Sequence, residues 1–354
     1  MTWSFRTRQA LTIARLELRR VFFAKRSLWV YLLALFPLLP FTGHGLSVTW
    51  RQQRWATQVT PREKLETVAE GQTLDEVRRA LGKPLAEGGW TDDDDKVEHR
   101  WMNLYDGRRR HRLYFRSGIL HEFNSESLVD FDQDRAVYAS MFQHFYLRLA
   151  IFFGCLGIFM NLFRGEMLDK TLHYWLLAPV RRETLLAGKY LAGLAASSLI
   201  FAAGTALCFY GTLWYQDAAE LRNYWSTQGP SHLIWYVATA ALACVGYGSV
   251  FLAAGLLVRN PIVPAAVLLV WESIHGFLPA MLQKFSVLYY VQSICPVPAV
   301  PLDDGAPALV RMLLAPSEPA PAWQAAIGLG LVTLLVLWAA ARAVRRLELQ
   351  YGTD

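Results

Sequence analysis

Charged residues are scarce in this chain, and the scarcity is uneven along it. Of the 354 residues, 18% are charged and 54% are hydrophobic, whereas a soluble domain carries about a quarter of charged residues. The deficit falls in apolar runs of about 18 residues or more, each long enough to cross the hydrocarbon core of a bilayer as a helix. The composition therefore excludes an ordinary soluble domain and indicates a polytopic membrane protein.

Cysteine is rare, and the motifs of several enzyme classes are missing. Three of the four cysteines (Cys155, Cys208 and Cys244) lie inside apolar runs, where a free cysteine behaves as a small hydrophobe. No Cys-x-x-Cys or Cys/His spacing indicates zinc or a disulfide framework. Gly188-Lys189 and Gly82-Lys83 lack the pattern of a P-loop. We expect no cofactor, no metal and no ATP hydrolysis in this chain.

The excess of positive charge, +6, is explained by membrane topology rather than by nucleic acid. Lys and Arg cluster at the ends of the apolar runs, and most of those in short connections fall on one side. The short loops of the other side carry only Arg222, Lys284 and Arg311. The positive-inside rule then places both termini in the cytoplasm. We expect no nucleic-acid partner.

Six membrane spans are predicted, at 28–49, 143–163, 188–214, 232–258, 262–283 and 322–341. The first is predicted to be a retained span, not a cleavable signal peptide, because it is too long and no small-x-small site follows it. Four prolines (37, 40, 264 and 279) are expected to kink or break spans locally. The fold class is thus an all-α polytopic membrane protein with six transmembrane helices and a small α+β extracytoplasmic domain. Four parts are expected: 1–27, an elbow helix; 28–50, the first span; 51–142, the extracytoplasmic domain; and 143–354, the remaining spans.

Residues 6–23 have the pattern of an amphipathic helix. Arg8, Arg15 and Arg19 share one face with Thr12, and the other face is apolar: Leu11, Ala14, Leu18 and Val21. Such a helix lies in the headgroup plane, with Arg toward lipid phosphates. The alternative is an ordinary basic flank of the first span.

The polar segment 51–142 is predicted to be a small extracytoplasmic domain. Thr73-Leu-Asp-Glu76 has the form of a capping box, and Gly82 is a helix stop, so we predict a helix over 74–81. Asp92–Asp95 is interpreted as a solvated loop rather than a calcium site, because the spacing of calcium ligands is absent.

Three strands are expected after this helix, near 96–105, 108–116 and 119–125. Asp106-Gly107 and Ser117-Gly118 are the turns between them. The face packed on the helix is expected to carry Leu113, Phe115, Ile119 and Phe123. A helix followed by these strands, with Gly71-x-Thr before the helix and Leu81-Gly-x-Pro at its end, resembles the SmpA/OmlA (BamE-like) domain. That resemblance implies a helix on a three-stranded sheet, and docking of an envelope protein.

Residues 162–190 form a charged, helix-prone island between two apolar runs. Their spacing predicts a helix with one charged and one apolar face, ended by Pro179. The charged face carries Glu166, Asp169, Lys170 and His173, and the apolar face Leu168, Leu172, Trp175 and Leu176. Such a segment either offers a surface to a cytoplasmic partner or only marks topology.

The same segment resembles the coupling region of ABC-2 type transporter permeases. The resemblance rests on Glu166, Thr171-Leu172, Leu176-Leu177, Pro179-Val180-Arg181 and Gly188-Lys189. Lys170 stands where that family usually has Gly, so we expect a more continuous helix there.

The resemblance implies a subunit of an exporter in the bacterial cytoplasmic membrane. It would pair with a second permease subunit, identical or different, and with an ABC ATPase subunit that binds the ATP. Coupling would pass through residues 164–189, and the candidates there are Glu166, Asp169, Lys170, Thr171, His173, Pro179, Arg181, Arg182 and Lys189. The alternative is a non-transporting envelope scaffold or sensor.

Glu272 and His275 lie three residues apart in the predicted fifth span. A charged group at the bilayer centre costs about 2.5–3.5 kcal/mol, so these side chains should face the bundle interior or water. We interpret them as part of the translocation path or of a dimer interface; a satisfied structural pair is the alternative. A metal site of the Glu-x-x-His kind would need a second such pair, which the spans lack. Glycines 188, 193, 246, 248 and 255 are expected to allow close helix packing, and the Pro-rich segment 284–321 to hold no long helix.

Overall fold

A computed structural model describes residues 3–24, 27–92, 96–177, 179–258, 260, 262–274, 277–298 and 319–345. The chain divides into two compact units. The helical unit comprises Met1–Pro40, Arg135–Gly211 and Arg222–Asp354, and the sheet unit comprises Phe41–Asp134 and Thr212–Leu221.

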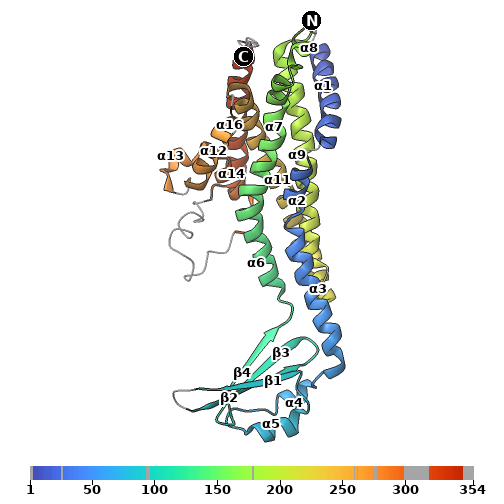
Figure 1. Ribbon diagram of the computed structural model, residues 1–354, viewed down its shortest axis with the longest axis vertical. Helices are drawn as coiled ribbons and strands as arrows, with labels where there is room; N and C mark the ends of the chain where they lie inside the picture. Colours follow the sequence, from blue (N-terminus) through green and yellow to red (C-terminus); the bar gives the residue numbers. More distant parts are fainter. Residues whose placement is uncertain are drawn as a thin grey trace. The chain divides into compact units, whose positions relative to one another are not determined.

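The helical unit is built from long helices and several short ones (Figure 1). They are α1 Trp3–Phe23, α2 Ser27–Leu35, α6 Phe131–Met141, η2 Phe142–Ala150, α7 Ile151–Leu168, α8 Leu172–Leu177, α9 Arg182–Leu213, α11 Gly229–Leu257, α12 Ile262–Ile274, α13 Ala280–Gln283, α14 Val287–Ile294 and α16 Ala322–Arg345. Four helices, α3 Leu38–Trp55, α6, α9 and α10 Ala218–Thr227, have residues assigned to both units. Residues Phe36 and Pro37 separate α2 from α3 as a turn, which confirms the predicted break there.

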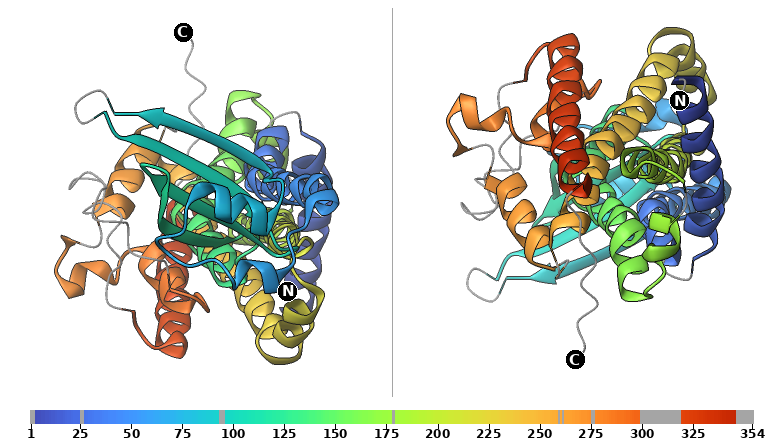
Figure 2. Two further views of the ribbon diagram at one scale, coloured as in Figure 1. Left: turned by 90° about the horizontal axis from the view of Figure 1, so that it is seen from below. Right: turned by 90° about the horizontal axis from the view of Figure 1, so that it is seen from above.

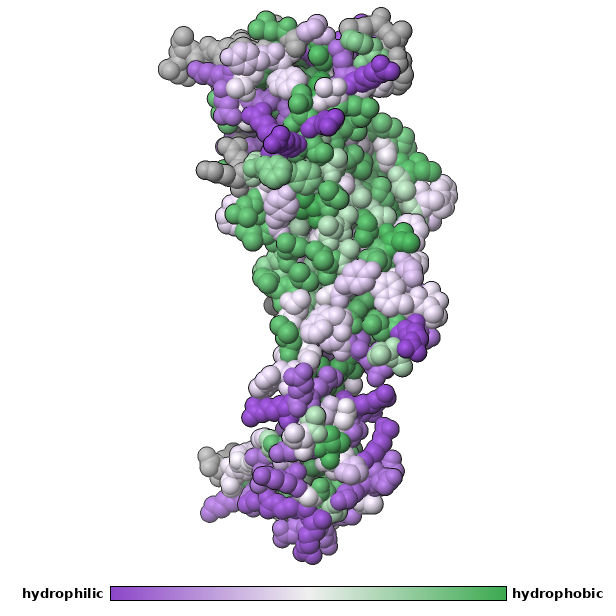
Figure 3. Space-filling model, turned by 90° about the vertical axis from the view of Figure 1, so that its right-hand side faces the viewer, coloured by the Kyte–Doolittle hydropathy of each residue, from purple (hydrophilic) through white to green (hydrophobic). Residues whose placement is uncertain are grey.

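Five helical stretches are long and apolar enough to cross a membrane: Ser27–Gln58, Phe131–Leu168, Arg182–Leu213, Gly229–Leu257 and Ala322–Arg345. Large apolar side chains remain exposed along them, among them Leu199, Ile234 and Leu334. Figure 3 shows apolar side chains covering much of the visible face of the helical unit. A surface of this kind is stable against lipid and not against water.

The predicted fifth span, 262–283, is not one α-helix. Helix α12 has 13 residues and is about 20 Å long at 1.5 Å per residue, which is short of the hydrocarbon core. Residues 277–279 are not α-helical, α13 begins directly after Pro279, and α14 follows it. The described residues therefore support five full crossings, and proline explains why the predicted fifth span is broken.

Helix α11 is central to the helical unit. It packs against α7, α14 and α16, and α2 packs against α7 as well. In the right-hand view of Figure 2, α16 and α12–α14 accordingly lie on one side and α1 and α2 on the other. The buried ring of Phe159 shows why glycine is needed here: a Cβ at Gly248 would lie 2.4 Å from it, and one at Gly193 2.7 Å. The predicted close packing at these glycines is confirmed.

The span that ends with α7 contains a π-helix, η2. It runs for nine residues, whereas π-helical geometry is usually confined to single turns and often marks functional sites. It buries two polar side chains, Gln143 and Arg148, inside an apolar span. Gln143 is satisfied by donating from Nε2 to the carbonyl of Val297, at 2.7 Å.

The sheet unit contains an antiparallel four-stranded meander with a helix on one face. Its strands are β1 Ala86–Thr91, β2 Glu98–Tyr105, β3 Arg109–Arg116 and β4 Ile119–Ser127, in that order. Helix α5, Leu74–Leu81, begins at a complete capping box between Thr73 and Glu76. The unit also has η1 Ala56–Gln58 and α4 Arg62–Leu65. The helix 74–81 and both predicted turns are confirmed, with positive φ at Gly107, Ser117 and Gly118.

Two expectations about this sheet were wrong. The sheet has four strands, not three. The sequence pattern did not predict β1, because this strand has two adjacent glycines, Gly88 and Gly89, and no strand-like alternation. In β4, Leu120 is buried and Ile119 is 49% exposed. A register shift at Tyr114/Phe115 pairs Phe115 with Leu120, and a bulge of this kind changes which residues face the core. The resulting core contains Leu65, Val77, Leu81, Met102, Leu104, Leu113, Phe115 and Leu120, whereas Phe123 is 38% exposed.

Asp106 organises the turn between β2 and β3. Its Oδ1 accepts the backbone N–H groups of Arg108 and Arg109, at 2.8 and 2.6 Å, and its Oδ2 lies 3.0 Å from Nε2 of His111. Burial alone would raise the pKa of this carboxyl. The backbone donors and His111 outweigh burial and lower its pKa below the usual value.

Candidate functional site at the α7–α9 junction

Helix α7 ends in a Schellman motif. The N–H of Thr171 donates to the carbonyl of Glu166 at 2.9 Å, and that of Lys170 donates to Met167 at 3.3 Å. Lys170 has φ +54°, a left-handed conformation that favours glycine. The expectation that Lys170 would make the helix more continuous was wrong. The hydrogen bonds of the motif hold Lys170 in the conformation that glycine would adopt.

This turn removes the single amphipathic helix that the spacing predicted. Residues 166 and 173 lie in different helices, α7 and α8, so the periodicity does not carry across. Glu166 is buried, whereas Asp169 and Lys170 are exposed. On the predicted apolar face, Leu168 is exposed and Leu172 is buried. Helices α7 and α8 therefore each bury their own set of residues, and the two predicted faces do not continue from one helix into the other.

Lys189 lies at the centre of a buried ionic cluster. It is 0% exposed, and its Nζ lies 2.7 Å from Oε1 of Glu17 and 2.9 Å from Oε1 of Glu166. The ammonium group also lies near the rings of Phe163 and Trp175, 5.4 and 5.6 Å from their centroids. An ammonium buried this deeply is stable only with such partners.

Two further side chains complete this cluster. Arg20 donates from Nη1 to Oε1 of Glu166 at 3.0 Å, and Trp175 donates from Nε1 to the same oxygen at 3.2 Å. We call the five residues Glu17, Arg20, Glu166, Trp175 and Lys189 the α1 clamp. It joins α1 to α7, α8 and α9, and two carboxylates balance its two cations.

Glu17, Arg20 and Trp175 were not among the predicted site residues. Glu17 could have been found, because it is the only acidic residue of α1 and lies one helical turn from Ile13 and Val21. Those two neighbours face the protein, as Glu17 itself does, and Leu11 is 62% exposed. The predicted apolar face of α1 is therefore wrong in part, whereas Arg8, Arg15 and Arg19 are exposed as expected.

Helix α1 crosses α9 at Gly188. A Cβ at this position would lie 2.8 Å from Ile13 Cβ and 2.9 Å from the carbonyl oxygen of Ala10. The glycine lets the two backbones approach closely. The next residue, Lys189, then reaches Glu17 from the same turn of α9.

The other residues considered in the coupling segment lie outside the α1 clamp. Arg182 donates from Nη1 to the carbonyls of Val344 and Arg345, at 3.4 and 3.0 Å, and so caps the end of α16. Glu183 forms an ion pair with Arg345. Arg181 and Pro179 are exposed, and Thr171 is half-buried. The side chain of His173 lies outside the described residues.

The outer side of the junction is apolar and exposed. Leu168, Tyr174 and Leu177 are exposed on α7 and α8, and the charged residues Asp169, Lys170 and Arg181 of the same segment are exposed as well. We call these six residues the outer surface. Of the nine predicted coupling residues, Asp169, Lys170 and Arg181 belong to this surface, and Glu166 and Lys189 belong to the α1 clamp.

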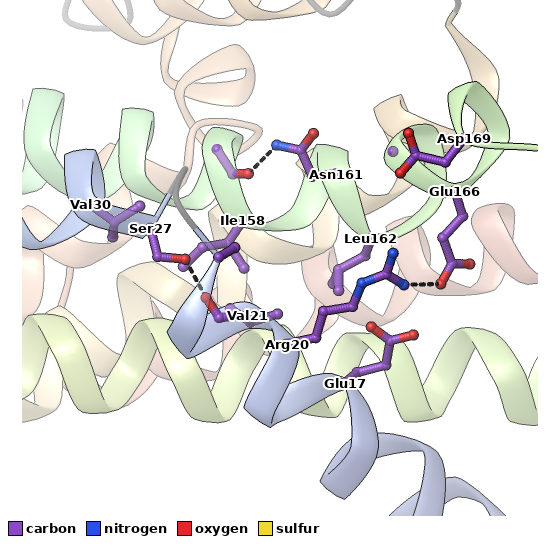
Figure 4. A pocket seen from close by; sticks show the side chains of 13 residues that line it. Glu17, Arg20, Val21, Ser27, Val30, Ile158, Asn161, Leu162, Glu166 and Asp169 are labelled. Atoms are coloured by element: carbon purple, nitrogen blue, oxygen red, sulfur yellow. Dashed lines mark hydrogen bonds and ion pairs between the residues drawn. The ribbon is translucent and has the colours of Figure 1, made fainter. Parts of the chain in front are cut away.

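A cavity of about 260 Å³ lies between α1, α2 and α7, next to the α1 clamp. Its charged end is formed by Glu17, Arg20, Glu166 and Asp169, and its apolar walls by Val21, Val30, Ile158 and Leu162 (Figure 4). Asn161 lines it as well and donates to the carbonyl of Gly157.

The second predicted site contains Glu272, which caps α14. Its Oε1 accepts the N–H of Val287 at 3.0 Å, and its Oε2 accepts the N–H of Leu288 at 3.1 Å and the hydroxyl of Ser286 at 2.6 Å. A carboxylate is favourable at a helix N-terminus because of its free N–H groups and the helix dipole. His275 lies outside the described residues, so the pairing of Glu272 with His275 stays a prediction.

The helical unit and its five long apolar helices define a multi-pass membrane protein. Within that class, the chain belongs to the ABC-2 family of transporters: the family model described as ABC-2 family transporter protein matches residues 11–271. Members of this family are typically the non-enzymatic transmembrane component of an ABC transporter, and they generally work with an ABC ATPase. Neither the curated proteins nor the solved structures gave a match. The matched range includes α1 from residue 11 onward and all of α7, α8 and α9, and therefore the whole α1 clamp.

Proposed function

We propose that this chain is the permease subunit of an ATP-driven exporter in the bacterial cytoplasmic membrane. A separate ATPase subunit binds and hydrolyses ATP, and a second permease subunit completes the translocation path. One observation carries the proposal: in a chain of this family, the α7–α9 junction has an exposed outer surface whose inner side is anchored in three helices.

The outer surface is the proposed docking site of the ATPase. Its apolar part, Leu168, Tyr174 and Leu177, is large and exposed, and exposed apolar patches with polar rims mark protein interfaces. The charged rim of Asp169, Lys170 and Arg181 would set the orientation of the partner.

The α1 clamp is the proposed route by which motion enters the membrane helices. A displacement of α8 acts on Trp175, which shares Glu166 Oε1 with Lys189 and Arg20. Because Lys189 also binds Glu17, the same displacement acts on α1. The elbow helix then moves together with α7 and α9.

Topology and the sheet unit complete the proposal. Both termini lie in the cytoplasm and the segment 51–142 lies outside, where it docks an envelope protein. The charge bias of the loops supports this orientation. The face of α12 around Glu272 lines the translocation path or the dimer interface.

The docking proposal is tested by truncating the outer surface. The variant Leu177→Ala, in membranes with the ATPase that co-purifies with the chain, should reduce transport-coupled ATP hydrolysis by about tenfold. Met281 is the matched control, since it is apolar and 81% exposed, as Leu177 is, but lies on α13. Met281→Ala should leave coupling unchanged.

Two results would overturn the proposal. One is a purified chain that never associates with a nucleotide-hydrolysing protein. The other is labelling of a cysteine at Lys170 from the periplasmic side by a membrane-impermeant reagent.

A further inference from the structure

The cavity beside the α1 clamp has the polarity of an amphiphile. Its walls at Val21, Val30, Ile158 and Leu162 are apolar, and its other end is charged. Its volume of about 260 Å³ lies just below the range of about 300–1,000 Å³ that is usual for small-molecule sites. It therefore suits a polar headgroup and the first part of an alkyl chain rather than a whole lipid.

At the charged end of the cavity, carboxylate oxygens are available to accept hydrogen bonds. Glu166 is only 2% exposed. Its three donors, Arg20, Trp175 and Lys189, all bind Oε1. Its Oε2 has no hydrogen-bond partner within the part of the chain that the structure describes. A buried carboxylate oxygen left unsatisfied is costly, so a donor from outside the chain would be stabilised there. Asp169 adds an exposed carboxylate to the same cavity.

The opposite charge is available beside these acceptors. Arg20 binds Glu166 through Nη1, and its side chain remains 56% exposed, so part of the guanidinium is accessible. Guanidinium groups bind phosphate through several parallel N–H donors. The cavity thus offers a cation and acceptors close together.

We propose that this cavity binds the headgroup of a phospholipid with a primary amine. The ammonium donates to Glu166 Oε2 and to Asp169, the phosphate accepts from Arg20, and the acyl chains leave along the apolar walls. An anionic lipid without an amine fits less well, because its headgroup would bring no donor charge to the two carboxylates. The site shares Asp169 with the outer surface. Its test is still independent of the proposed docking, because lipid binding is measured without ATPase, nucleotide or transport.

The test measures lipid retention on the purified full-length chain by native mass spectrometry. Phosphatidylethanolamine, phosphatidylcholine and phosphatidylglycerol are added at equal concentration. Phosphatidylethanolamine should be retained at least about tenfold more than the other two. This is the discrimination expected when a charge-assisted hydrogen bond is gained or lost. Equal retention of the three lipids would overturn the proposal.

Variants locate the site. Asp169→Asn, at an exposed position, should weaken retention of phosphatidylethanolamine by about tenfold. Gly165→Leu should abolish it by filling the cavity, because a Cβ at Gly165 meets only Asn161, 3.8 Å away. Gly330→Leu is the control, since nothing lies within 4 Å of a Cβ there. Unchanged retention in both cavity variants would refute the assignment.

Competition by free phosphoethanolamine or by dodecylamine shows whether the site recognises a soluble amine or an amine that carries an alkyl chain. Dodecylamine should compete with the lipid, because it has both the ammonium and the alkyl chain. Phosphoethanolamine should not compete at the same concentration. If it competes as well as the lipid does, the site recognises a soluble amine and the lipid assignment is wrong.

Discussion

Lys189 and Glu166 form an ion pair of 2.9 Å between α9 and α7, and both side chains are buried. The same ammonium group lies 2.7 Å from Glu17 on α1. One buried cation therefore holds α7 and α9 to α1, whose Glu17 lies 172 residues before Lys189 in the sequence.

Removal of this cation should strongly destabilise the helical unit. Lys189→Met keeps the length of the side chain but leaves two buried carboxylates with one fewer cation. We expect a loss of about 3–5 kcal/mol, measured as unfolding in mixed micelles. Arg181→Met, at an exposed position, should change stability by less than about 0.5 kcal/mol. Equal effects of the two variants would show that the cluster contributes nothing to the stability of the helical unit.

Glycine at position 170 should stabilise the junction. Lys170 has φ +54° at the end of α7, and a left-handed conformation costs a non-glycine residue about 1–2 kcal/mol. Lys170→Gly should therefore raise the apparent free energy of unfolding by about 1 kcal/mol. Asp169→Gly is the matched control, because Asp169 has φ −75° and gains nothing from glycine. A destabilised Lys170→Gly variant would contradict the role given to the Schellman motif.

A single methyl group at Gly188 should separate α1 from α9. The added Cβ would lie 2.8 Å from Ile13 and 2.9 Å from the backbone of Ala10, so Gly188→Ala should cost about 1–3 kcal/mol. The check is thermal stability together with cysteine crosslinking of α1 to α9. Gly330→Ala, where the space is open, should be neutral or slightly stabilising. An unchanged crosslinking rate in Gly188→Ala would refute the close crossing.

Loss of the carboxylate at Glu272 should release the start of α14. Glu272→Leu leaves the hydroxyl of Ser286 and the N–H groups of Val287 and Leu288 without acceptors, at about 1–3 kcal/mol each. Glu272→Gln keeps one acceptor oxygen and should cost less. Hydrogen exchange at residues 287 and 288 reports the change directly. Similar exchange in the wild type and in Glu272→Leu would exclude the capping role.

The sheet unit should lose stability in acid through Asp106. Because its pKa is lower in the folded state than the usual 3.8, the unfolded state binds the proton more tightly. The stabilisation is therefore present above about pH 4 and is lost as the pH falls through the folded value. Hydrogen exchange of Arg108 and Arg109 in the full chain, between pH 6 and pH 3, measures it. Asp106→Asn should flatten this pH dependence, and a wild-type-like profile would contradict the assignment.

Local sequence patterns determined much of this protein. The apolar runs gave the long helices because a bilayer span needs about 20 apolar residues. Thr73, Glu76 and Gly82 set the limits of α5 because capping depends on neighbouring residues only. The turns at Gly107 and Gly118 followed for the same reason. Motif residues from Glu166 to Lys189 pointed to the family, which the family model confirmed.

The tertiary structure alone decided how those residues meet. Periodicity predicted Glu166 on an exposed face, but the turn at Lys170 and the arrival of Lys189 from α9 placed it in a buried cluster. The strand β1 and the bulge in β4 depend on pairing with distant residues, which a local pattern does not contain. The partners of a buried charge are chosen by packing between helices, so Glu17 and Glu272 show their roles only in the folded chain.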